Sequence, residues 1–137
     1  MGRRLVPDSA HAAWPSWLFE DVLSERALDV AQNWVRAGLL DNGEAEALAL
    51  AQEQGSEGFV TDDAAAREMA VALGFEVSGS LGVILRAAAR GAVSPIEAFD
   101  ALERLQNRST LWLSAKVRDE ARIALERIVE TRGSQPQ

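Results

Sequence analysis

The chain has 137 residues, of which 47% are hydrophobic and 26% are charged, proportions that are ordinary for a globular domain. It carries 14 basic and 21 acidic residues, a net charge of −7, whereas a typical nucleic-acid-binding domain is basic. The lack of cysteine excludes a disulfide framework and a thiolate zinc site, and no apolar run approaches the ~20 residues of a membrane-spanning helix, so we expect a cytoplasmic protein without a membrane partner.

The N-terminal stretch is rich in proline, serine and alanine and shows no clear period. We therefore expect a poorly ordered segment over residues 1–16, a single partial domain over 17–132 and a disordered tail over 133–137. Residues 18–23 are expected to be extended. Ser24 is the predicted N-cap of a helix that continues to about Ala37 and ends at Gly38.

Helical and strand patterns alternate in the middle of the chain. A helix is predicted from about Asp41 to Gly55, and a short strand over Phe59–Thr61. A second helix over Ala64–Leu73 and a second strand over Phe75–Val77 follow. Strands that alternate with helices predict a parallel α/β sheet, although two convincing strands and a weak third make it unusually small.

The C-terminal part is predicted to be helical. One helix covers about Leu81–Arg90 and stops at Gly91. Ser94 begins the next, which runs to about Gln106, because Pro95 and Glu97 complete the pattern of an N-cap serine, a proline in the first turn and a capping-box glutamate. A last helix is predicted over about Ser114–Thr131.

Three acidic residues stand where the predicted helix and strand pattern can gather them. Glu44 lies in the first turn of its helix, and Asp62 and Asp63 lie at the end of the first strand. Oxygen ligands are those that Mg²⁺ and Mn²⁺ prefer, so a site for a hard cation is one interpretation of these acids.

The order of these motifs resembles the C-terminal two-thirds of a PIN-domain protein, and in particular a bacterial and archaeal branch described as predicted nucleic-acid-binding, toxin-like proteins. The resemblance covers roughly Trp14 to Glu130 and is carried by Asp41-x-Gly43-Glu44-Ala45-Glu46-Ala47, by Val60-Thr61-Asp62-Asp63 with Arg67, by Gly74, by Gly79-Ser80-Leu81-Gly82-Val83 and by Gly91.

The resemblance implies a three-layer α/β/α fold and a Mg²⁺- or Mn²⁺-dependent ribonuclease of the toxin–antitoxin type. By position it implies that Glu44, Asp62 and Asp63 hold the metal, with one or both aspartates facing it, and that Arg67 and Ser80 support the site. An RNA substrate and an antitoxin-like protein are the partners that it implies.

The family's opening strand, which carries a metal-binding aspartate, has no clear counterpart before Trp14. Asp8 is the nearest candidate, but Pro7 is unfavourable inside a strand. We therefore expect an N-terminally truncated, helix-rich domain whose nuclease activity is weakened or absent. The alternative is a non-catalytic interaction module, or a vestigial nuclease fragment, that binds a partner or forms a homodimer.

Structural roles compete with each functional assignment. Asp41 and Glu44 have the spacing of a capping box, and either Asp62 or Asp63 can cap the helix that follows. Arg67 is also spaced to pair with Asp63. The four tryptophans are interpreted as packing anchors, with Trp14 and Trp17 the candidates for exposure. Arg86 and Arg90 are interpreted as part of a solvated face rather than as contacts to RNA phosphates. His11 is expected to be neither a base nor a ligand.

Overall fold

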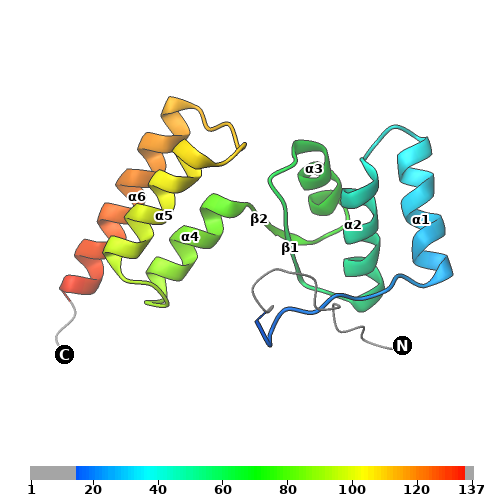
Figure 1. Cartoon of the computed structure of the whole chain (residues 1–137), viewed down its shortest axis with the longest axis horizontal. Helices are drawn as coiled ribbons and strands as arrows, with labels where there is room; N and C mark the ends of the chain where they lie inside the picture. The colour runs from blue at the N-terminus through cyan, green and yellow to red at the C-terminus, as the bar shows by residue number, and fades with distance from the viewer. Residues whose placement is uncertain (1–14, 135–137) are drawn as a thin grey trace. The chain divides into compact units, whose positions relative to one another are not determined.

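The computed structural model describes residues 15–134, so the expectations for Asp8, His11 and Trp14 lie outside the described residues. Six helices and two short strands occupy this part of the chain (Figure 1). They divide into two compact units, one with residues up to Phe59 and Asp63–Phe75, the other with Val60–Asp62 and the residues from Glu76 onward.

The first unit contains α1 (Glu25–Arg36), α2 (Asn42–Gln54) and α3 (Ala64–Ala72). Ser24 caps α1 as predicted, since its hydroxyl accepts a hydrogen bond from the Ala27 N–H at 3.1 Å. Helix α2 packs against both α1 and α3. Buried alanines at these helix contacts allow the backbones to approach closely, and larger apolar side chains complete the core: Ala27, Ala31, Leu40, Ala45, Leu48, Ala49, Phe59, Ala66 and Ala70.

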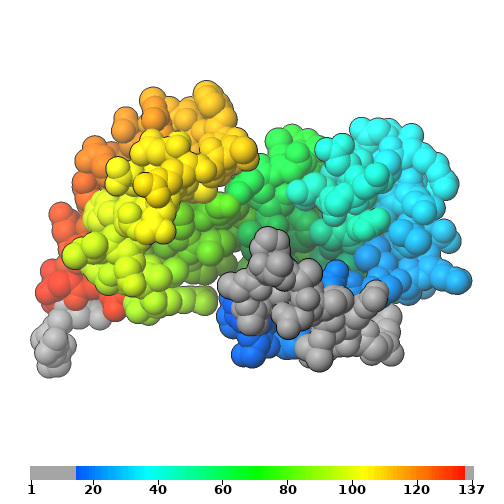
Figure 2. Space-filling view, in the orientation of Figure 1, coloured from blue at the N-terminus to red at the C-terminus, as the bar shows by residue number. Residues whose placement is uncertain are grey.

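The second unit contains α4 (Ser80–Ala89), α5 (Pro95–Arg108) and α6 (Ala115–Gly133), which pack against one another (Figure 1). Ala88, Ala98 and Leu125, one from each helix, are buried together, and Ile84, Leu85, Val93 and Ile128 pack around them. In the space-filling view, α5 in yellow and α6 in orange to red form a continuous outer surface (Figure 2).

The two strands are β1 (Gly58–Val60) and β2 (Glu76–Ser78), and they pair in a short parallel sheet. Helix α3 lies between them in the sequence, as a parallel crossover requires. Both strands therefore occur where they were predicted, each displaced by one residue. The helix-rich α/β class with a short parallel sheet is confirmed.

The segment 18–23, expected to be extended, contains no helix, and Glu20 forms an isolated bridge there. One expectation about a side chain is wrong. Trp112, predicted to be a packing anchor, is 82% exposed, because in the connection between α5 and α6 it is the neighbouring Leu111 and Leu113 that are partly buried. None of the helices within residues 15–134 has the length and apolar character needed to cross a bilayer.

Candidate functional site

Asp62 follows β1 and lies against the N-terminus of α4. Its Oδ1 accepts a hydrogen bond from the Ser80 backbone N–H at 2.8 Å, and its Oδ2 accepts one from the Ser80 hydroxyl. Ser80 is the first residue of α4, so its N–H has no acceptor within the helix. The partial positive charge of a helix N-terminus stabilises an anion. The two hydrogen bonds from Ser80 thus fix the orientation of the Asp62 side chain.

Strand pairing brings these two residues together although they are distant in the sequence. The Thr61 N–H donates to the Ser78 carbonyl oxygen at 2.8 Å, and Thr61 is the buried polar residue at this point, with 6% of its surface exposed. The pairing places the residue after Thr61 beside the turn that leads into α4. Ser80, assigned a supporting role by the family resemblance, therefore contacts the predicted metal ligand Asp62 directly.

Ser78 connects a basic side chain, that of Arg86, to the Asp62–Ser80 pair. Its hydroxyl accepts a hydrogen bond from Arg86 Nη2 at 3.2 Å. Asp62, Ser78, Ser80 and Arg86 all belong to the second unit. No sequence pattern connects Arg86 with the acids, because Arg86 lies eight residues after Ser78 and the contact depends on a side chain that extends back along the helix.

Asp63 is directed to a different helix. It is the N-cap of α3, and its Oδ2 accepts a hydrogen bond from the Ala66 N–H at 2.8 Å. Asp63 therefore has the capping role that is one of its two predicted roles. It belongs to the first unit, whereas Asp62 belongs to the second. A role of Asp63 as a metal ligand remains a prediction.

Glu44 lies in the first turn of α2 and is partly buried. The predicted capping box with Asp41 is wrong in one half, since Asp41 occupies the N-cap position without a side-chain hydrogen bond to the helix. Arg67 is exposed on α3. The structure places Glu44 and Arg67 in the first unit, and their metal-binding and supporting roles remain predictions.

The donor chemistry of Asp62 fits a hard cation. Each carboxylate oxygen has two lone pairs, so the two hydrogen bonds from Ser80 leave acceptor capacity on an exposed side chain. Mg²⁺ and Mn²⁺ bind such oxygens. Within residues 15–134, no three acidic or histidine side chains are grouped closely enough to form a complete site.

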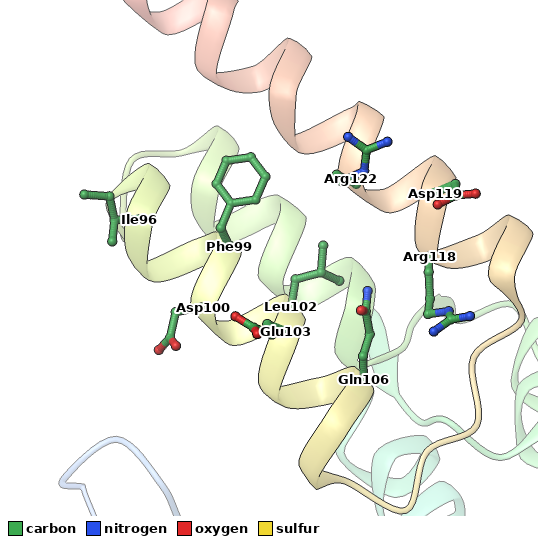
Figure 3. Close-up of a pocket in the computed structure, with 9 residues that line it drawn as sticks. All are labelled: Ile96, Phe99, Asp100, Leu102, Glu103, Gln106, Arg118, Asp119 and Arg122. Carbon is green, nitrogen blue, oxygen red and sulfur yellow. The ribbon is translucent and has the colours of Figure 1, made fainter.

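A groove of about 680 Å³ lies between α5 and α6 of the second unit (Figure 3). Ile96, Phe99 and Leu102 provide its apolar lining, and charged side chains surround them. Ile96 is 81% exposed. None of the acids predicted for the metal site lines this groove, so it is a separate feature of the surface.

Comparison with known proteins identifies one family. A sequence model of a family described as "PIN domain" matches residues 6–127, which is most of the chain. Comparisons with curated proteins and with solved structures gave no match. The family match agrees with the helix-rich α/β architecture and its short parallel sheet. The chain therefore belongs to the PIN-domain family.

Proposed function

We propose that this protein is a Mg²⁺- or Mn²⁺-dependent ribonuclease of the toxin–antitoxin type. Membership of the PIN-domain family indicates a nuclease-type function that acts on RNA. The observation that carries the proposal further is the Asp62–Ser80 pair, in which two hydrogen bonds orient the Asp62 carboxyl group just after β1. Glu44 and Asp63 are the further metal ligands in this proposal, and Arg67 supports them.

In this proposal, the residues of the chain bind and orient the reactants. A bound divalent ion supplies Lewis-acid stabilisation of the charge that develops on the phosphoryl oxygens. Asp62 contributes an oxygen ligand, and Ser80 keeps that carboxylate from rotating. We expect low activity, because within residues 15–134 no three acidic or histidine side chains are grouped closely enough to complete a metal site.

The proposal is tested by cleavage of a fluorescent single-stranded RNA with and without Mn²⁺. We expect Mn²⁺-stimulated cleavage that Asp62→Asn and Glu44→Gln each abolish. Glu46→Gln is the matched control, because Glu46 is exposed on the same helix as Glu44 and has the same charge. Cleavage that persists in Asp62→Asn, or that Glu46→Gln abolishes equally, contradicts the assignment.

A second candidate function is self-association through the groove between α5 and α6, as a homodimeric interaction module. Ile96 is exposed at this groove. The α5 wall carries Asp100 and Glu103, and the α6 wall carries Arg118, Asp119 and Arg122 (Figure 3). A two-fold axis through the groove would place the acidic α5 wall of one copy opposite the α6 wall of the other, where two arginines outnumber one aspartate. An antitoxin-like protein is the alternative occupant.

A further inference from the structure

We propose that Arg86 binds a phosphate of the RNA substrate beside Asp62. The inference rests on the proposed function in taking RNA as the ligand. It concerns a residue to which the family resemblance assigns no role, and it follows from the direction, the partners and the charge of one side chain in the second unit.

The direction of the side chain is the first observation. Arg86 is in the last turn of α4, where a cation is favoured by the negative end of the helix dipole. Its guanidinium nevertheless contacts Ser78, which precedes the helix. Because Arg86 is the sixth residue after Ser80, its side chain extends toward an N-terminus that is about 9 Å away along the helix axis. The positive charge is thus carried toward Asp62 and away from the end that the dipole favours.

The hydrogen-bonding capacity of the guanidinium is the second observation. Arginine has five N–H donors, and within residues 15–134 the contact with Ser78 is the single hydrogen bond formed by the Arg86 side chain. No carboxylate of the described residues lies within ion-pair distance, in contrast with Arg104 and Arg122, which pair with Asp100 and Glu126. The remaining donors form a planar fork that matches the oxygens of a phosphate.

The position relative to Asp62 is the third observation. Ser78 and Ser80 are separated by Gly79 alone, and they bind Arg86 and Asp62 respectively. Three extended residues span about 7 Å between their first and last Cα atoms. A guanidinium and a carboxylate are therefore anchored to the same short turn. A phosphodiester oriented by Arg86 would lie beside the carboxylate proposed to hold the metal.

The test measures binding of a fluorescent single-stranded RNA by anisotropy, with Ca²⁺ in place of Mg²⁺ so that binding is separated from cleavage. We expect Arg86→Gln to weaken binding about tenfold, the loss of one charge-assisted contact. It should also reduce the slope of log K against log[salt] by about 0.7, the value for one phosphate contact on a single strand. Arg86→Lys should keep the slope and lose part of the affinity.

Two further variants separate binding from mere structure. Arg90→Gln makes the same change in charge one turn further along the chain, at the C-cap of α4, and should leave the affinity within about twofold of the wild type. Ser78→Ala removes the anchor and keeps the charge, so it should weaken binding without changing the salt slope. Circular dichroism melts of all variants verify that they are folded.

The outcomes for the two proposals are distinguishable. Unchanged affinity in Arg86→Gln, or an equal loss in Arg86→Gln and Arg90→Gln, overturns the assignment of Arg86 even if the wild type cleaves RNA. Arg86-dependent binding without Mn²⁺-stimulated cleavage sustains the assignment and overturns the nuclease. A wild-type chain that binds no RNA overturns both.

Discussion

Asp62 and Ser80 are 18 residues apart in the sequence and are joined by two hydrogen bonds, of which the one from the Ser80 backbone N–H measures 2.8 Å. At the other end of α4, Arg132 Nη1 donates to the Ala88 carbonyl oxygen at 2.9 Å. Helix α4 therefore has a carboxylate at its N-terminus and a guanidinium at its C-terminus, the arrangement that complements the helix dipole. Neither contact is local, so both connect α4 to other elements of the second unit.

Replacement of Asp62 should destabilise the fold independently of any activity. Asp62→Ala removes both acceptors and should lower the free energy of unfolding by about 1 kcal/mol, the usual effect of losing an N-terminal cap. Asp62→Asn keeps one carbonyl oxygen and should cost less. Urea unfolding measures both variants, with Asp100→Ala, from an exposed ion pair, as the control. Wild-type stability in Asp62→Ala would show that the contact with Ser80 is energetically neutral.

Added Mn²⁺ should raise the melting temperature if the carboxylates form a metal site. At about 100 times the dissociation constant, binding adds roughly 2.7 kcal/mol to the free energy of unfolding. Asp62→Asn should abolish this increase, and Glu46→Gln should retain it. A shift of equal size in all three proteins would instead indicate non-specific binding to an acidic surface.

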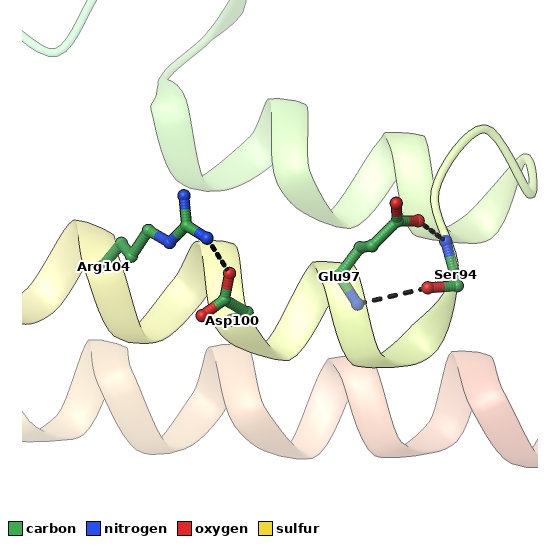
Figure 4. A network of polar contacts seen from close by, with 4 residues as sticks. All are labelled: Ser94, Glu97, Asp100 and Arg104. Atoms are coloured by element: carbon green, nitrogen blue, oxygen red, sulfur yellow. Dashed lines mark hydrogen bonds and ion pairs between the residues drawn. The ribbon is translucent and has the colours of Figure 1, made fainter.

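The capping box at the start of α5 predicts a dependence of stability on pH. The Ser94 backbone N–H donates to the Glu97 carboxylate at 2.7 Å, and the Glu97 N–H donates to the Ser94 hydroxyl at 3.2 Å (Figure 4). The bond from the Ser94 backbone, and then that from its side chain, lowers the pKa of Glu97 below its ordinary value of 4.5.

A carboxylate whose pKa is lowered on folding stabilises the native state above its unfolded-state pKa. The difference in free energy of unfolding between the wild type and Glu97→Gln should therefore be constant above a pH of about 4.5 and decrease as the pH falls through the lowered folded-state pKa of Glu97. Unfolding in urea from neutral to acidic pH measures it. Glu103→Gln, on the same helix, controls for the loss of one carboxylate. A difference that does not change with pH would exclude the cap as its source.

Gly91 is constrained by its backbone conformation and by Arg132. Its φ of +72° lies in the left-handed region, and a Cβ at this position would collide with the Arg132 guanidinium. Gly91→Ala should cost about 1 kcal/mol from the backbone conformation alone. The same substitution in an Arg132→Ala background separates the two causes, since only the collision is relieved there. Additive effects in this double-mutant cycle would show that the flexible arginine moves aside freely.

Self-association through α5 and α6 makes a prediction about Ile96. A charge at this exposed position should prevent dimer formation, so Ile96→Lys should remain monomeric at concentrations where the wild type dimerises in light-scattering measurements. Val71→Lys is the control, because Val71 is an exposed apolar residue in the first unit, outside the groove. A wild type that is monomeric at all concentrations would exclude self-association, and the occupant of the groove would then be a different protein.

The sequence alone determined the features that depend on near neighbours. Ser24, Ser94 and Ser114 were predicted to begin helices, and each accepts the expected hydrogen bond from an N–H three residues later. Gly55 and Gly91 end their helices at positive φ. A cap or a glycine acts within one helical turn, so the pattern of residues is sufficient to predict it.

Only the tertiary structure decided what the acids contact. Asp62 and Asp63 are adjacent and chemically identical. Asp63 nevertheless caps α3 through the N–H three residues later, whereas Asp62 binds Ser80, the first residue of α4. The contacts of Arg86 with Ser78 and of Arg132 with Ala88 were equally inaccessible to sequence patterns. Such partners are selected by strand pairing and helix packing, which bring together groups that are distant along the chain and that no local propensity encodes.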